Sequence, residues 1–330
     1  MTLAAFLQDL LAFAVQGALV TVVAAALARV LPIDRPTLGL AWWRAVLVAA
    51  IVLPFLAVWA PAAGGSVQIG FGTFGPASTF SSLSLGRAYW AEVVTAALVL
   101  GLIFSTLRLV RGLQRLGTCR ERAAPFDPRA LGGLEDLVGA RAEVRLSRDV
   151  VVPATFGLRR PMVLLPAAVQ EMEAERQRAI VAHELFHVRR RDWPMAVAEE
   201  ALAALFWFHP AVHFLLGRIR LAREQCVDAA VVAVLGGRKA YLESLLEVAR
   251  GRVPSEPLAA ALFLGEHHLS ERVELLLKEV VMSKLRALCH LSLGGLLLML
   301  AGSVASWSFP LSSLALPEKE KTEASAEKAK

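Results

Sequence analysis

Four long apolar stretches dominate the pattern of the chain, and most of its polar residues lie between the third and the fourth. The apolar stretches cover residues 10–31, 41–62, 89–110 and 285–309. A helix needs about 20 mainly apolar residues to cross the hydrocarbon core of a bilayer, so each stretch is long enough to do so. Buried helices of a soluble core are the alternative, and these lengths disfavour it. The pattern predicts three transmembrane helices within residues 1–111 and a fourth at 285–309.

Composition supports a membrane protein. Of the 330 residues, 56% are hydrophobic and only 19% are charged, and the mean hydropathy is +0.55. Soluble domains carry about 25% charged residues, so this balance is unusual for a soluble chain of that length. The three cysteines have no CxxC spacing, which indicates neither a disulfide framework nor a zinc finger.

The positions of the basic residues predict the orientation of these helices. The loop 63–86 contains no Lys or Arg, whereas the segment after the third apolar stretch is rich in Arg. Because short basic loops stay on the cytoplasmic side, we expect both termini outside and residues 112–284 in the cytosol of a bacterial-type cell. The first stretch lacks a basic start and a cleavage site, so we expect it to be retained. The net charge of +6 then reflects topology, and direct nucleic-acid binding is not expected.

Residues 112–284 are expected to form a mainly α-helical domain of the α+β class with a small β element. Residues 115–141 predict a linker and a short helix. Turn residues then separate two short apolar runs within 151–166, which predicts a pair of strands. Helical periodicity predicts helices at 171–190, 194–208, 211–235, 239–250 and 270–280. Residues 318–330 have balanced charge and few apolar side chains, so residues 310–330 are expected to form a short disordered tail outside the membrane.

The helix 194–208 is apolar but contains the neighbouring pair Glu199 and Glu200. Its length and these two carboxylates argue against a full span. We expect it in the core or at the membrane interface.

The motif HELFH, residues 183–187, predicts a metal site. His183 and His187 are four residues apart, so a helix presents both imidazoles on one face, where they can hold one Zn²⁺ per chain. Glu184 lies beside them and is expected to act as the general base, because the metal lowers the pKa of a bound water and an unligated carboxylate takes its proton.

A catalytic zinc keeps three protein ligands, and the segment RLAREQCVDAAVV offers the third. Glu224 and Asp228 lie four residues apart on an otherwise apolar helical stripe, where unpaired carboxylates would be unfavourable. We expect Glu224 as the third ligand and Asp228 as the acceptor for a ligand imidazole. The alternative is a solvated helix edge on which Arg220 or Arg223 pairs with them.

Further segments contain candidate residues. The run 161–165 can be an exposed strand, and Met162, Val163 and Leu164 would then pair with an extended substrate. Prolines and internal packing explain this run equally well. His209 and His213 flank Pro210, which interrupts the helix, so a structural role is expected. Asp192 is expected to tie the end of the ligand helix to neighbouring arginines, and the run 189–191 to face solvent or lipid headgroups.

Several segments in order resemble one family. HELFHVRRRDW, LFWFHPAVHF, RIRLAREQCVDAAVV and VPATFGLRRPMVLLP resemble the membrane metallopeptidases of the β-lactam-sensor and methicillin-resistance-regulator type, over residues 1–309. The resemblance implies a cytosolic zinc endopeptidase with ligands at His183, His187 and Glu224. It also implies a relay of an outside signal that leads to loss of a DNA-binding repressor.

The full-length sensors of that family continue into an extracellular penicillin-binding domain after the fourth span. Here only residues 310–330 follow, and the S-x-x-K spelled by 325–328 lies in a charged tail. We expect no acylation there, and a signal that arrives through the outer loop, the spans or a partner.

The first functional hypothesis is a membrane-anchored zinc endopeptidase that cleaves itself or a cytosolic protein such as a repressor. A membrane-protein quality-control peptidase and a non-catalytic signalling scaffold are the alternatives. An intramembrane protease fits less well, because the charged segment EMEAERQR precedes the motif.

Overall fold

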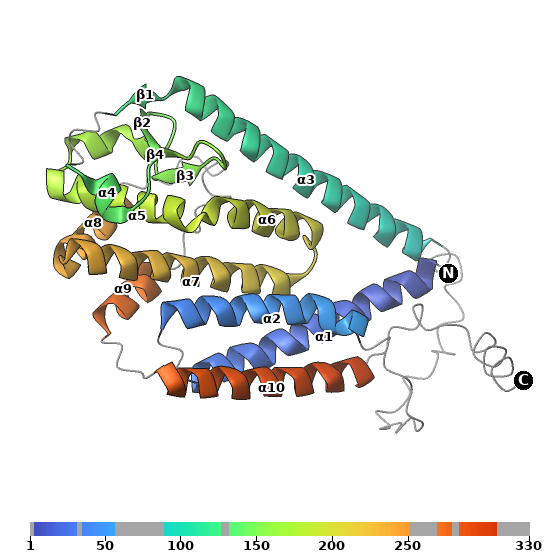
Figure 1. Ribbon diagram of the computed structural model, residues 1–330. Helices are drawn as coiled ribbons and strands as arrows, with labels where there is room; N and C mark the ends of the chain where they lie inside the picture. Colours follow the sequence, from blue (N-terminus) through green and yellow to red (C-terminus); the bar gives the residue numbers. More distant parts are fainter. Residues whose placement is uncertain are drawn as a thin grey trace, which may run out of the picture.

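The computed structural model describes residues 3–31, 35–56, 89–126, 132–250, 269–278 and 284–308. The chain is mainly helical and has one small sheet, which confirms that part of the predicted fold class. Figure 1 shows the sheet at one end with α3 running from it toward the other, while α2, α1 and α10 lie together on the far side of α7.

Each of the four apolar stretches is helical where it is described. The helices are α1 (Leu3–Val30), α2 (Pro36–Leu56), α3 (Trp90–Arg122) and α10 (Lys284–Ser308). By length and composition, α1 and α3 can cross a membrane, while α2 and α10 contain shorter apolar helical stretches, Pro36–Val52 and Ser292–Ala305. Four spans and their orientation therefore stay a prediction. Residues 57–62, the loop 63–86 and the tail 310–330 lie outside the described residues.

The segment 115–122 was predicted as a linker, and this is wrong. It continues α3, and Leu116 near its end is buried against Phe156 and Leu164 of the sheet. The buried apolar contact makes helix more favourable than coil here. The sheet therefore follows directly on a candidate span.

The sheet has the strands β1 (Ala124–Pro125), β2 (Glu143–Ser147), β3 (Ala154–Phe156) and β4 (Met162–Pro166). The predicted pair is β3 and β4, which are antiparallel around a turn where Gly157 has φ +98°. The order β1-β2-β4-β3 places β4 between two partners. Met162, Val163 and Leu164 are therefore buried in a strand that has a partner strand on each side. The prediction that they form a free edge for a substrate is wrong.

The remaining elements surround the candidate site. They are α4 (Leu134–Val138), the 3₁₀ turn η3 (Ala167–Glu171), α5 (Ala174–Arg190), α6 (Asp192–Leu205), α7 (Pro210–Leu235), α8 (Arg238–Arg250) and α9 (Leu269–Leu277). Pro210 lies in the first turn of α7, and Gly236 ends it with φ 72°, as residues of these types favour. The helix predicted from residue 171 begins at Ala174, and the one predicted to reach residue 208 ends at Leu205.

Two apolar cores share α7. Its second half, with Val227 and Val231, packs with α5, the sheet and α8. Its first half, with Leu215 and Ile219, packs with α1, α2 and α10. The division into a membrane part and a domain at 112–284 stays a prediction, and α7 belongs to both packing units.

Candidate metal centre

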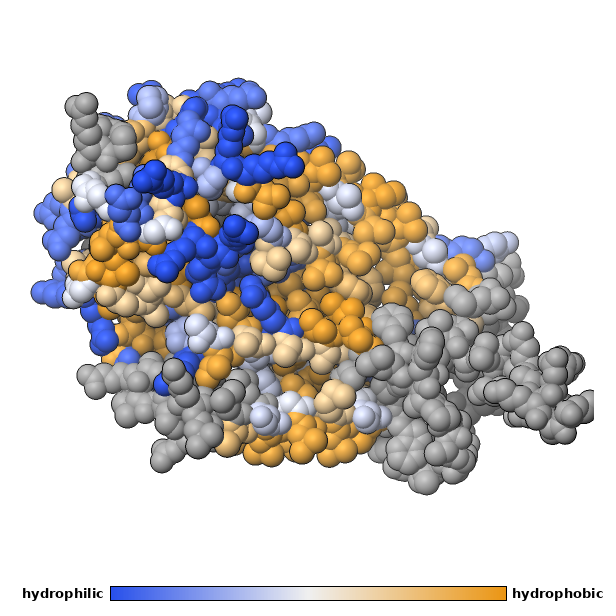
Figure 2. Space-filling model, in the orientation of Figure 1, coloured by the Kyte–Doolittle hydropathy of each residue, from blue (hydrophilic) through white to orange (hydrophobic). Residues whose placement is uncertain are grey.

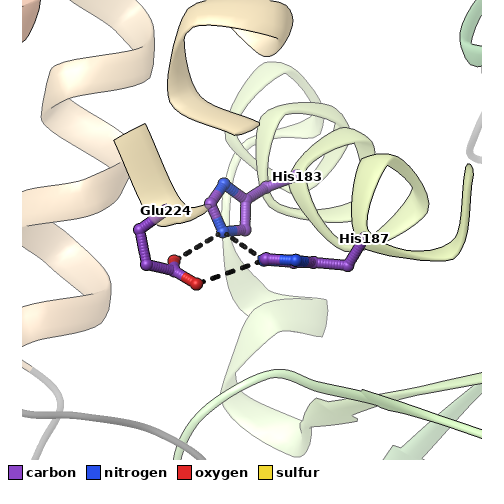
Figure 3. Close-up of side chains that lie close together, drawn as sticks. All are labelled: His183, His187 and Glu224. Atoms are coloured by element: carbon purple, nitrogen blue, oxygen red, sulfur yellow. Dashed lines mark hydrogen bonds and ion pairs between the residues drawn. The ribbon is translucent and has the colours of Figure 1, made fainter. Parts of the chain in front are cut away.

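Three side chains from two helices converge at the centre of the site. His183 and His187 lie one turn apart on α5, and Glu224 lies on α7 (Figure 3). The Nε2 atoms of the two histidines are 3.2 Å apart. The Glu224 carboxylate oxygens lie 3.3 Å from Nε2 of His183 and 3.5 Å from Nε2 of His187. Atoms bound to one tetrahedral zinc at about 2.1 Å are about 3.4 Å from each other, so the three donors fit such an ion.

The outer nitrogens of both imidazoles have partners that orient the rings. Nδ1 of His187 lies 2.9 Å from Oδ2 of Asp192. An ionised carboxylate can accept a hydrogen bond but cannot donate one. Nδ1 of His183 lies 2.8 Å from the hydroxyl of Tyr241, and that hydroxyl donates to Oδ1 of Asp228 at 2.5 Å. Both Nδ1 atoms therefore carry a proton, and each ring in its neutral form presents the lone pair of Nε2 to the centre. Two such lone pairs and a carboxylate that face one another suit a bound cation.

Asp228 is held by a guanidinium from α9. Arg272 donates to its two oxygens at 2.8 Å and 2.6 Å, and Nη1 of Arg272 lies 3.4 Å from Glu224. Oδ1 of Asp228 is 3.5 Å from Nδ1 of His183, so Tyr241 bridges the two groups that were predicted to bond directly. Asp228 is buried, with 1% of its surface exposed, and Arg272 supplies the charge that makes this burial acceptable.

The alternative pairing of Glu224 and Asp228 with arginines of their own helix is wrong. Arg223 pairs instead with Glu199, and Arg220 with Glu200. Both glutamates come from α6, so these arginines join α7 to its neighbour.

Charge complementarity sets the protonation of the site. Burial alone would raise the pKa of Glu224, but His187 and Arg272 outweigh it and hold the pKa well below its usual range. Burial lowers the pKa of His187, and Glu224 together with Asp192 more than reverses this, so the pKa is raised. Burial and Asp228 raise the pKa of Tyr241 well above its usual value, so its hydroxyl keeps the proton that it donates.

Glu184 is buried next to the three donors. The hydroxyl of Thr155, on β3, donates to its Oε2 at 2.6 Å and lies 3.3 Å from its backbone oxygen. A carboxylate held by a single hydroxyl keeps other lone pairs to accept a proton. Glu184 therefore lies where the sheet meets the donor triangle.

Sequence reasoning did not assign Tyr241, Arg272 or the contact of Asp192 with His187. Asp192 does bind Arg190 as predicted, at 3.2 Å. Arg191, with φ 56°, interrupts the helix between α5 and α6, and Asp192 directly after it contacts His187. A carboxylate five residues after the second histidine was the available signal. Tyr241 is 58 residues from His183 and Arg272 is 44 residues from Asp228, so no local pattern links them.

The remaining histidine candidates do not join this centre. Within the part of the chain that the structure describes, the group of His183, His187 and Glu224 is the one set of three such residues close enough to share a metal. His209 is buried against α1, and Nε2 of His213 lies 3.2 Å from the carbonyl oxygen of Trp207. A structural role for both, as predicted, agrees with these contacts. In the run 189–191, Arg189 donates to the carbonyl of Val138.

Comparison with known proteins agrees with this site. Residues 78–276, more than half of the chain, match the family described as BlaR1 peptidase M56, so the chain belongs to that family of metallopeptidases. A segment of 95 residues is 32% identical to the regulatory protein BlaR1 of Bacillus licheniformis. That segment covers 28% of this chain and 16% of the relative. The resemblance seen in the sequence is thereby confirmed, and the family implies a membrane-associated peptidase.

Proposed function

We propose that the chain is a membrane-anchored zinc endopeptidase that hydrolyses protein substrates in the cytosol. The observation that carries the proposal is the convergence of two imidazole nitrogens and one carboxylate at 3.2 to 3.5 Å. Two imidazoles and a carboxylate are a typical zinc donor set. His183, His187 and Glu224 would hold the ion.

The surrounding residues supply the rest of the chemistry. A bound zinc would contribute Lewis acidity, which makes water a competent nucleophile near neutral pH. Glu184 would accept the proton of that water and deliver it to the leaving amine. Thr155 holds one oxygen of Glu184 in place, while Asp192 and Tyr241 keep the two imidazoles in their orientation.

The position of β3 indicates where the substrate would run. Among the described strands, β3 has β4 on one side and no strand on the other, and Thr155 at its centre contacts Glu184. An extended peptide that pairs with Ala154–Phe156 would pass beside the donor triangle. The free edge of β3 therefore takes the substrate-binding role that the sequence predicted for β4.

We further propose a role in signal relay. The relative from Bacillus licheniformis is named a regulatory protein. One candidate span, α3, leads directly into the sheet. Self-cleavage, cleavage of a DNA-binding repressor, or both would convert a signal at the membrane into a change of transcription. The arrangement with four spans, both termini outside and the peptidase domain in the cytosol belongs to this proposal.

A conservative change at Glu184 tests the catalytic role. The purified Glu184→Gln variant should retain zinc, because Glu184 is outside the donor triangle, and should lose at least about 100-fold in cleavage of an unstructured protein or of itself. Glu175→Gln, at an exposed position of the same helix, is the matched control and should leave cleavage unchanged. Equal proteolysis by the Glu184 variant and the wild type would refute the role. A preference for unfolded membrane proteins would favour quality control.

A further inference from the structure

α6 and the first half of α7 form a helical hairpin that extends away from the candidate metal centre, here called the α6–α7 hairpin and defined as residues 192–219. One arm starts at Asp192 beside His187, and α7 returns to Glu224. In Figure 1 both arms lie between α3 on one side and α2 on the other. From Pro210 to Glu224 the helix measures about 21 Å, at 1.5 Å per residue.

The tip of the α6–α7 hairpin contacts the interior of both candidate spans. The indole of Trp207 donates to the carbonyl oxygen of Leu98 in α3, at 3.2 Å. A Cβ at Gly101 would lie 2.1 Å from the Trp207 ring, and a Cβ at Gly17 of α1 would lie 2.9 Å from His209. Small residues at close helix contacts are typical of packing inside membranes. The tip therefore lies at the level of the middle of α1.

The outward face of the α6–α7 hairpin is apolar. Met195, Leu205 and Phe214 are 46%, 52% and 45% exposed. The other exposed positions of the hairpin are Ala198, Ala201, Pro210 and His213. None of them carries a formal charge except a protonated His213, whose Nε2 faces the carbonyl of Trp207. A water-facing hairpin of this length would be expected to carry charges on its outer side.

The charged residues beside the hairpin core are paired, with Arg218 bound to Glu271 of α9 at 2.7 Å and two further pairs between α6 and α7. Glu199 receives two hydrogen bonds from Arg223, at 3.1 Å and 2.9 Å, and Glu200 pairs with Arg220 at 2.5 Å. Both glutamates are buried. Mutual pairing away from the outer face is how ionisable residues are accommodated at membrane depth.

We propose that the α6–α7 hairpin is a re-entrant membrane element whose outer face lies against lipid acyl chains. The inference rests on the proposed membrane arrangement, in which α1 and α3 cross the bilayer. Lipid is the occupant because this face continues the exposed apolar face of α3, which includes Val99, Leu100 and Phe104. Figure 2 shows hydrophobic residues over α3 and α10, and hydrophilic residues gathered over the end with the sheet.

The lengths place the candidate metal centre relative to the bilayer. The hydrocarbon core is about 30 Å thick, so its midplane is about 15 Å from either edge. A tip at the midplane and an arm of about 21 Å put Glu224 just outside the hydrocarbon, at the level of the headgroups. The peptidase would therefore act on peptide bonds held close to the membrane surface.

Collision accessibility of spin labels tests the proposal. Cys119, Cys226 and Cys289 are free cysteines and are first replaced by Ala. Single nitroxide-labelled cysteines are then introduced at Met195, Leu205 and Phe214 of the full chain in phosphatidylcholine–phosphatidylglycerol vesicles. Oxygen partitions into the acyl region, and a water-soluble nickel chelate is excluded from it. Val99 of α3 serves as the lipid reference. Leu158, 72% exposed beside the sheet, serves as the water reference.

We expect labels at Leu205 and Phe214 to match Val99, with at least about a 5-fold higher oxygen-to-nickel accessibility ratio than Leu158. Met195, nearer the site, should give an intermediate ratio. Ratios at Leu205 and Phe214 equal to that of Leu158, with Val99 in lipid, would overturn the hairpin proposal and leave the membrane arrangement intact. Equal ratios at Met195 and Leu205 would indicate a hairpin lying along the surface and would also overturn it. A water-like ratio at Val99 would instead contradict the membrane arrangement itself.

Discussion

His183 illustrates how one contact outside the donor triangle determines the chemistry of a ring. Its Nδ1 faces the hydroxyl of Tyr241, and this hydroxyl donates its own proton in a hydrogen bond to Asp228. The hydroxyl can therefore only accept from Nδ1, and the neutral ring presents the lone pair of Nε2. The same logic at His187 runs through Asp192. Both rings are set for metal binding by residues that do not reach the centre.

Replacing Tyr241 by Phe tests this dependence. The change removes the acceptor of the Nδ1 proton of His183 and one of the two donors to Oδ1 of buried Asp228, so zinc affinity should fall about 10-fold or more. The free energy of unfolding should fall by about 1 to 3 kcal/mol. Competition with a chelator measures the affinity. Tyr89→Phe, at the other tyrosine of the chain, is the control, since Tyr89 is 68% exposed. Identical zinc affinity in both variants would contradict the bridging role.

At the residue scale, the sequence predicts the parts of the site that are local. His183, Glu184 and His187 lie within one helical segment, so the helix period alone relates them. Helix periodicity also places Glu224 and Asp228 on one otherwise apolar face of α7. It does not give the distance between that face and α5. Tyr241 and Arg272 enter only through tertiary packing, which no spacing along the chain encodes.

At the scale of elements, the two ends of α7 were predictable and strand neighbours were not. Pro210 and Gly236 fix the bounds of α7 through their own backbone preferences. The order of the sheet depends on β2 pairing in parallel with β4, which needs a crossover rather than a tight turn. The burial of all five residues of β4 follows from that pairing. A periodic pattern of apolar residues could not distinguish this central strand from an edge strand.

The pair of Glu199 and Arg223 predicts how α6 and α7 depend on each other. Arg223→Met should destabilise the protein by about 3 to 5 kcal/mol, because it leaves Glu199 buried without a counter-charge. The double variant Glu199→Met with Arg223→Met should regain most of the lost free energy of unfolding. In it, both buried charges are replaced by apolar side chains. Urea unfolding of the detergent-solubilised chain measures both. Additive losses in the double variant would show that the pair is not coupled.

At the scale of the whole molecule, α7 connects the membrane helices to the candidate metal centre. Its first half packs with α1, α2 and α10, and its second half carries Glu224 and packs with α5. Glu224 also contacts Arg272 of α9, so three helices, α5, α7 and α9, meet at one carboxylate. A cation at the centre would therefore stabilise the contacts among these helices.

Metal removal should then weaken the entire fold. Without a cation, the Glu224 carboxylate and two lone pairs face one another across the contact of α5 and α7. A ligand present at 1,000 times its dissociation constant stabilises the native state by about 4 kcal/mol, which corresponds to a fall of about 10 °C in the unfolding midpoint on chelation. Added Zn²⁺ should restore it. His187→Ala should start at the lower midpoint and show no response to chelator, and an unchanged midpoint in the chelated wild type would refute a structural contribution of the metal.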